Sequence, residues 1–305
     1  MNVVMMLIML MQAGDAECKC GKLEVTGYSH MIYEYVMDGS EENYGLMTLP
    51  YVRISFKGKI TDKLSFRFEP NLVNGKIQYA YADLNHIPYV TLRMGKMKVP
   101  FGYEYQPYAT NNVTPYLSGA TRLFYDLGYG ADLGIMAIAE LPYTELKLAL
   151  YENELNEYEK GYVGNLNLKP VDILTVGGSY YKAQITNWYT LYEGYLGLNH
   201  DIVNIEGGYI YRENDDIDLA SNGFYAQIYR KFDLPVENHY ICPAVKFSML
   251  EPNDAVPDDK TTEVWAGFNL GFSKNIRLMV YYNLNLEETN DVDNDRFVMD
   301  LHFSF

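Results

Sequence analysis

Apolar and polar side chains alternate along most of this chain, and the alternation restricts its possible folds more than any other feature. A period of two residues is typical of a β-strand whose two faces meet different surroundings. The pattern recurs in sixteen segments beyond residue 22. The expected strands are 22–37, 52–57, 64–69, 76–84, 90–97, 132–140, 145–151, 161–168, 171–183, 188–198, 202–212, 223–232, 240–249, 262–272, 276–286 and 296–305. Helical signals are scarce, so the expected fold class is all-β.

The connections between these segments fall into two length classes that alternate along the chain. Short ones lie at 61–63, 141–143, 169–170 and 273–275, and longer acidic ones lie at 38–43, 152–160, 213–221, 251–260 and 287–295. Tight turns at one rim and longer loops at the other are typical of a transmembrane barrel. We therefore predict an antiparallel transmembrane β-barrel of about sixteen strands, with both termini at the short-turn rim. Such a barrel encloses an aqueous channel, and the polar inward faces fit a wet lumen.

The last segment indicates a membrane environment. Its apolar face carries Phe297, Met299, Leu301, Phe303 and Phe305, and its other face carries Val298, Asp300, His302 and Ser304. A strand between lipid and a water-filled lumen has this pattern. The chain also holds 30 Tyr and 13 Phe, and aromatic residues favour strands and membrane interfaces. A terminal strand ending on Phe resembles the assembly signal of outer-membrane proteins, which predicts the bacterial outer membrane as the location.

The N-terminus has the features of a secretion signal. Residues 3–11 form an apolar run, and small residues suited to cleavage follow at 14–16. We predict a signal peptide at 1–16 and a single barrel domain at 17–305, with a buried N-terminal strand as the alternative. The Asp-Ala-Glu before Cys18 does not fit a lipid-attachment site.

One connection, between Thr91 and Gly134, is much longer than the others. An insert of about thirty residues lies there between two amphipathic strands, where most connections need only a few residues. Thr114-Pro115 is expected to cap a short helix over 117–124, and Gly128 to end it. A loop with its own helix suits a pore constriction, and an ordinary surface excursion is the alternative.

Three short passages over residues 80–134 carry a resemblance to a known family. Residues 93–101 (RMGKMKVPF) resemble the R-x-G-x-x-K-x-P-F passage of the phosphate-selective porins O and P. Residues 125–128 (YDLG) look like that family's R-D-L-G, with Tyr125 in place of the Arg, and 80–84 (AYADL) is similar to its A-Y-V-D strand. The resemblance implies an outer-membrane porin, and resemblance to sixteen-stranded porins implies a homotrimer.

Catalytic patterns are weak in this sequence. The histidines are His30, His86, His200, His239 and His302. None has a metal-ligand spacing, and no Ser has a nucleophile-elbow context. Cys18, Cys20 and Cys242 define no disulfide framework. We therefore predict no enzyme activity, no cofactor, no metal site and no nucleic-acid partner.

Two other classes of protein stay open as alternatives. An outer-membrane barrel hydrolase would need a catalytic group at one rim, and His30 and His302 could meet across the closing seam, where a lumen-lining pair is the plainer interpretation. A fatty-acid channel would need an N-terminal plug, for which residues 17–21 are too short.

The formal net charge of -16 is mostly in the long connections. Residues 291–295 carry alternate carboxylates like part of a calcium loop, but lack its glycine and distal glutamate. We interpret these loops as a hydrated outer rim that divalent cations bridge to anionic lipid.

The expected pore lining is mixed in charge. The insert from 99 to 128 holds Arg122 against Glu104 and Asp126. The alternation projects inward Arg53, Lys57, Arg67, Arg93, Lys147, Lys246 and Arg277, beside Glu69, Glu145, Glu193, Glu206, Glu263 and Asp300. The predicted constriction residues are Arg53, Arg67, Arg93, Glu104, Arg122 and Asp126.

Two interpretations of these residues remain. The wall arginines could set up a transverse field against acidic groups of the insert, or they could pair with Glu69 and neighbouring carboxylates. Because phosphate capture needs several converging Lys or Arg side chains, we predict passive diffusion of small hydrophilic solutes and ions with weak selectivity. The phosphate specificity that the family name implies is the alternative.

Overall fold

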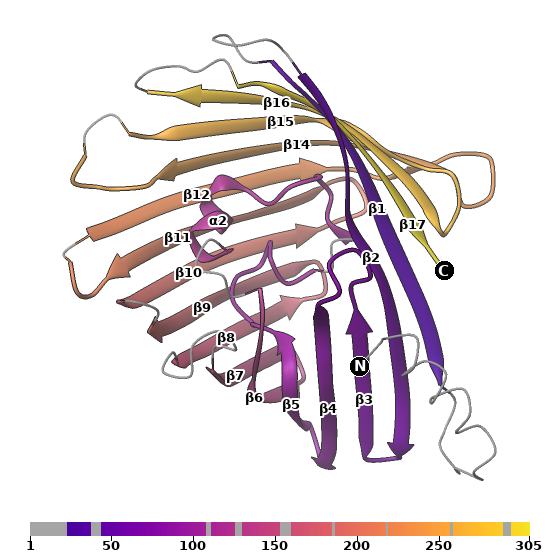
Figure 1. Cartoon of the computed structure of the whole chain (residues 1–305), viewed down its shortest axis with the longest axis vertical. Coiled ribbons are helices and arrows are strands. Elements are labelled where there is room, and N and C mark those ends of the chain that lie inside the picture. The colour runs from indigo at the N-terminus through magenta and orange to yellow at the C-terminus, as the bar shows by residue number, and fades with distance from the viewer. Residues whose placement is uncertain are drawn as a thin grey trace.

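A computed structural model describes residues 23–37, 44–107, 111–125, 130–152, 160–184, 187–217, 219–256, 259–288 and 294–305. The predicted signal peptide, Cys18, Cys20, Asp126, Gly128 and residues 291–293 lie outside these ranges. Within them, the strands form one sheet (Figure 1). The strands are β1 (Glu24–Val36), β2 (Tyr44–Thr61), β3 (Leu64–Pro70), β4 (Ile77–Ile87), β5 (Val90–Lys98), β6 (Ala131–Leu141), β7 (Thr144–Glu152), β8 (Lys160–Val171), β9 (Leu174–Gln184), β10 (Trp188–Asn199), β11 (Asn204–Asn214), β12 (Leu219–Tyr229), β13 (Phe232–Asp233), β14 (Tyr240–Glu251), β15 (Thr261–Gly271), β16 (Ile276–Glu287) and β17 (Arg296–Ser304).

The sheet closes on itself. Successive strands pair antiparallel, and β17 pairs antiparallel with β1. The short β13 continues β12, because both pair with β14. The predicted barrel of sixteen antiparallel strands is therefore confirmed. Closure leaves no strand edge, which the interior of a bilayer requires.

Side chains divide between the two faces as the alternation predicts. On β17, Val298, Asp300 and His302 are buried inside the barrel, whereas Phe303 and Phe305 face outward. On β6, Leu133 and Ile135 are likewise exposed on the outside. The outer surface is thus an apolar band.

The start of β1 and the end of the chain lie at the rim predicted for the termini, and residues 1–22 lie outside the described ranges. Gly27 and Phe305 exchange two backbone hydrogen bonds of 3.0 Å at the rim of the tight turns. One turn position is wrong, because β8 continues past 169–170 and the chain reverses at 172–173. Pro170 fits inside the strand because the register shifts between Leu168 and Val171, and a proline is tolerated at such an irregularity.

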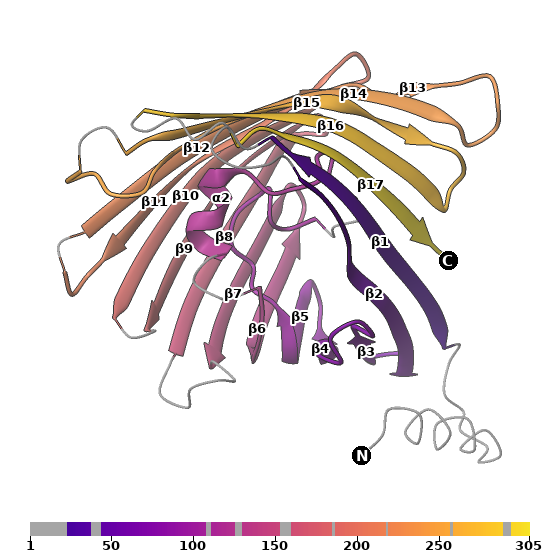
Figure 2. The same cartoon turned by 45° about the horizontal axis from the view of Figure 1, so that its top comes forward.

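The connection between β5 and β6 folds into the barrel (Figures 1 and 2). We call residues 99–130 the inner loop. It carries the helix α2 (Gly119–Tyr125), close to the predicted helix. The predicted cap is wrong: the hydroxyl of Ser118 accepts the N–H of Thr121 at 3.1 Å, whereas Thr114 donates to the carbonyl of Tyr116. Among the described residues, no helix is long and apolar enough to cross a membrane.

The inner loop fills one side of the interior. Phe101 and Phe124 stack at 4.7 Å between ring centroids, and Phe124 packs edge-on against Tyr181 of β9. Inward residues of the neighbouring strands, such as Leu191 and Met136, complete this apolar cluster. The inward faces were predicted to be polar. This is wrong on the side of the inner loop, because the loop supplies apolar side chains against which inward residues of the wall pack.

Candidate functional site

The inner loop is fixed to the barrel wall at three places. The first is the segment that directly follows β5. Its backbone N–H groups at Gly102 and Tyr103 donate to Ser179 at 2.9 Å and Glu193 at 3.1 Å. Gly102 has a φ of 75°, and a Cβ there would overlap Oε2 of Glu193. Glycine adopts this left-handed backbone conformation without strain and leaves room for the carboxylate of Glu193.

The second attachment is a buried ion pair. Nζ of Lys246, on β14, donates to Oε1 of Glu104 at 2.9 Å, and Lys246 is 0% exposed. The hydroxyls of Ser118 and Thr121 also donate to Glu104. Burial alone would raise the pKa of Glu104, but Lys246 and these hydroxyls outweigh it and hold the pKa below its ordinary value. Glu104 is therefore a structural carboxylate with its hydrogen-bond capacity used.

The third attachment joins α2 and the segment before it to β14–β16. The N–H of Gly119 donates to Glu263 at 3.1 Å, and Arg122 forms an ion pair with the same carboxylate. The carbonyl of Val113 accepts hydrogen bonds from Asn269 at 3.0 Å and Tyr281 at 2.9 Å. These attachments hold the loop against β9–β16, and Tyr116 also forms a hydrogen bond with Glu34 of β1.

The remaining passage is a cavity of about 580 Å³ between the inner loop and β1, β2 and β4. We call it the main cavity. Its charged lining consists of Arg53, Lys98, Arg122 and Arg296, and no Asp or Glu occurs among the described residues that line it.

Carboxylates lie next to three of these cations. Arg53 is 3.7 Å from Glu69, Arg296 is 3.6 Å from Glu34, and Arg122 is paired with Glu263. None of these carboxylates lines the main cavity, so the guanidinium groups lie nearer to it than the carboxylates with which they pair.

A comparison with protein families identifies the chain's relatives. The family model described as phosphate-selective porin O and P matches residues 30–188, slightly more than half of the chain. The chain belongs to this porin family. The resemblance found in the sequence is confirmed, and the protein is an outer-membrane porin of a bacterium. No curated protein matches.

Solved structures show the same fold at low sequence identity. A loop-deletion mutant of OmpT, an outer membrane protein of Vibrio cholerae, has a TM-score of 0.73 and 11% identity, over 93% of this chain and 99% of that one. An anion-selective porin from Comamonas acidovorans has a TM-score of 0.71 and 11% identity over the same shares. OmpF of Salmonella typhi in complex with daunomycin has a TM-score of 0.70 and 14% identity, over 93% and 98%.

Only some of the predicted constriction residues of this porin line the main cavity. Arg53 and Arg122 line the main cavity. Arg67 is buried beside it and donates to Glu69 at 2.5 Å and to Ser55 at 3.1 Å. Arg93 is held by both oxygens of Asp83, at 2.7 and 2.9 Å.

Glu104 does not oppose the wall arginines. It pairs with Lys246 of the other wall, so its negative charge is neutralised there and does not face the arginines across the cavity. Pairing of Arg53 and Arg67 with Glu69, the alternative interpretation, is what the structure has. Asp126 lies outside the described residues.

Two cations of the main cavity were missed. Lys98 is the last residue of β5, one residue before the predicted insert, and its Nζ donates to the carbonyl of Pro107 at 2.8 Å. The R-x-G-x-x-K-x-P-F passage contains it, so the signal was present. Arg296 is the first residue of β17 and lies two residues before Val298, so the alternation places it on the inward face, although it was not among the predicted constriction residues.

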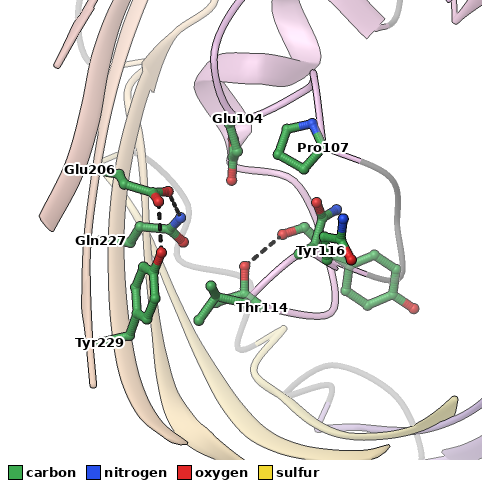
Figure 3. A pocket seen from close by; sticks show the side chains of 10 residues that line it. Glu104, Pro107, Thr114, Tyr116, Glu206, Gln227 and Tyr229 are labelled. Carbon is green, nitrogen blue, oxygen red and sulfur yellow. Dashed lines mark hydrogen bonds between the residues drawn. The ribbon is translucent and has the colours of Figure 1, made fainter. Parts of the chain in front are cut away.

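A second cavity, of about 50 Å³, lies on the other side of the inner loop (Figure 3). Both oxygens of Glu206 are used there, by Gln227 and by Tyr229, and Glu104 and Thr114 face it from the loop. On the same measure it is less than a tenth of the main cavity. The main cavity is therefore the larger candidate for the passage of solutes.

Proposed function

We propose that this porin is a homotrimeric passive channel for small hydrophilic solutes and ions, with a modest preference for anions and no high-affinity phosphate site. The observation that supports the preference is the charged lining of the main cavity, with Arg53, Lys98, Arg122 and Arg296 and no carboxylate among its described residues. Positive groups along a narrow passage raise the local concentration of anions.

The same pairs argue against tight phosphate binding. A phosphate site needs several donors whose hydrogen bonds are available to the ligand. Here three guanidinium groups already face Glu69, Glu34 and Glu263, and Lys98 donates to backbone oxygens. A phosphate would have to displace these partners, so its affinity would be low.

Two further parts of the proposal concern assembly and chemistry. OmpT of Vibrio cholerae has been solved in a trimer form, with a TM-score of 0.70, which supports a trimer of this barrel. We infer no covalent chemistry, because the described contacts of the lumen pair His30 and His302 include a carboxylate and a guanidinium rather than a nucleophile. The apolar outer band is the surface that outer-membrane lipid would cover.

Recording in planar lipid bilayers tests the proposal. Purified protein should give stepwise conductance, and the reversal potential in a KCl gradient should have the sign of a chloride preference. Millimolar phosphate should leave the chloride current nearly unchanged. Block by micromolar phosphate would restore the phosphate-specific alternative, and a cation preference would refute the role of the main cavity.

A matched pair of variants ties the preference to the cavity. Arg296→Gln removes a charge that lines the main cavity, whereas Lys147→Gln removes a lumen-face charge that does not line it. A unit charge about 8 Å from a permeating ion in water changes its energy by about 0.5 kcal/mol, roughly a twofold effect. Arg296→Gln should shift the permeability ratio by that amount toward cations, and Lys147→Gln should not.

A further inference from the structure

Three metal-ligating side chains meet at the seam that closes the barrel. His30 of β1 and His302 of β17 are direct partners in the antiparallel register, with ring centroids 3.6 Å apart. Asp300 precedes His302 by two residues on the same strand and therefore points to the same, inward face. All three are buried, so they form a group inside the wall rather than a surface cluster.

Their donor atoms are spaced as ligands of one ion. Oδ2 of Asp300 lies 2.8 Å from Nε2 of His302 and 3.4 Å from Nδ1 of His30. One ligand atom from each residue lies within 4.8 Å of the others. Donor atoms that share a tetrahedral zinc, with bonds of about 2.0–2.2 Å, lie roughly 3.3 Å apart. Small side-chain shifts would bring all three onto one ion.

The cluster also contains polar atoms with unused bonding capacity. Among the described residues, neither Nε2 of His30 nor Oδ1 of Asp300 has a hydrogen-bond partner, although both atoms are buried. A buried polar atom without a partner is unusual in a native protein and needs an explanation. A cation bound by the carboxylate and the two imidazoles would supply one for Asp300.

We propose that His30, Asp300 and His302 bind a divalent transition-metal ion, with Zn²⁺ as the best match. Two imidazoles and one carboxylate are a donor set that zinc accepts, and three protein ligands leave a fourth position for water. The ion would join the first strand of the barrel to the last. It would also place positive charge in the wall of the main cavity, which His30 lines.

One neighbouring group works against the ion. Nη2 of Arg277 lies 2.9 Å from Nδ1 of His302, and its charge opposes a cation. While Nδ1 accepts that hydrogen bond, the proton of His302 is on Nε2, facing Asp300. Zinc binding at Nε2 sends this proton to Nδ1 or to water, and Arg277 keeps its bond to the carbonyl of Asn112 at 3.0 Å. The arginine therefore lowers the metal affinity and makes binding reversible.

Metal binding to the folded porin, purified without a histidine tag, tests the proposal. In competition with a chromophoric chelator, the wild type should bind about one Zn²⁺ per chain. His30→Gln and His302→Gln should each weaken zinc binding by more than about 100-fold. That exceeds the loss expected for a residue that only hydrogen-bonds a metal ligand. The exposed residue His86, near the end of β4, gives the matched control, since His86→Gln should bind like the wild type.

Two more measurements test the zinc site if His30→Gln or His302→Gln does not fold. Zn²⁺ should raise the unfolding temperature of the wild type in a concentration-dependent way that EDTA reverses. Arg277→Gln should tighten binding by roughly 10-fold, because it removes the opposing charge. Wild type that takes up no zinc, or zinc binding that is equal in the wild type and His302→Gln, would overturn the assignment.

Discussion

The two sides of the barrel interior are built from the same kind of alternating strand, but one side is packed and apolar and the other is open and charged. On the β9–β16 side, the inner loop and the wall enclose Phe101, Phe124 and Tyr181 in a dry cluster. On the β1–β4 side, Arg53 and its neighbours border a cavity of about 580 Å³. The alternation selects which residues face inward, and the chemistry of those residues decides which side is closed and which conducts.

Charge is used differently on the two sides. Lys246 and Glu104 are fully withdrawn from water, so each depends on the other. On the open side, the side chain of Arg296 is 40% exposed and lies 3.6 Å from Glu34, and an ion pair of that kind contributes only about 0–1 kcal/mol. The closed side should therefore respond to a lost charge with a structural change, and the open side with a change in selectivity.

Lys246→Met should give the largest effect. It leaves the buried carboxylate of Glu104 without its cation, at a cost of about 3–5 kcal/mol. Because water fills the lumen next to the loop, we expect the loop to leave the wall while the barrel stays folded. Single-channel conductance should rise and protease should cleave the loop. Lys147→Met, at a pair with Glu145 whose side chains are 18% and 30% exposed, is the control. Wild-type behaviour of Lys246→Met would contradict the role of the Lys246–Glu104 pair.

Phe124→Ala should loosen the same loop through packing alone. The side chain is fully buried between Phe101 and Tyr181. Its truncation should cost the loop roughly 3 kcal/mol, the lower end for a core Phe, because the cluster borders water. Hydrogen exchange in residues 111–125 should accelerate. Phe303→Ala, on the outer face, should leave that exchange unchanged, and equal rates in the two variants would count against the cluster as the loop's anchor.

Acidification should have a smaller effect on the same attachment. The folded pKa of Glu104 lies below its ordinary value of 4.5, so its stabilising contribution is complete above that value and is lost as pH falls through the lower folded pKa. Conductance should stay constant from neutral pH down to about 4.5 and rise only below it. In Glu104→Gln this step should be absent. A step at higher pH would show that the carboxylate is not held in its charged form.

The smallest effect is expected on the open side. Arg53→Gln removes a charge that lines the main cavity, and Glu69 keeps Arg67 as its partner. The permeability ratio should move roughly twofold toward cations with little change in thermal stability. Arg93→Gln is the matched control, because Arg93 is bound by Asp83 away from the lining. A larger shift in Arg93→Gln than in Arg53→Gln would place the constriction elsewhere.

The fold could be predicted almost completely because lipid and water sort side chains by a simple rule. Phe297 to Phe305 alternate without a break, and the segment predicted at 276–286 is β16, Ile276–Glu287. The pairing of His30 with His302 also followed, because the first and last strands of a closed barrel must meet. The turn near Pro170 was misplaced, since a strand irregularity tolerates a proline that normally indicates a turn.

The site was harder to predict because its contacts are not local. The alternation placed Lys246 on the inner face, but it does not show that Glu104, 142 positions away, lies opposite. The helix cap failed for a related reason. Thr114-Pro115 has the right residues, but Ser118 is the residue that Glu104 positions at the start of α2.

The attachment of the inner loop has a consequence for the order of assembly. The residues that hold it follow it in the chain, from Ser179 to Tyr281, at separations of 77 to 168 positions. Contacts across such separations form late, because the intervening chain must be ordered first. The aperture of a newly made barrel therefore cannot reach its final width until the C-terminal half of the chain is in place. In a truncated or slowly completed chain, the inner loop would lack the strands β9–β16 that hold it.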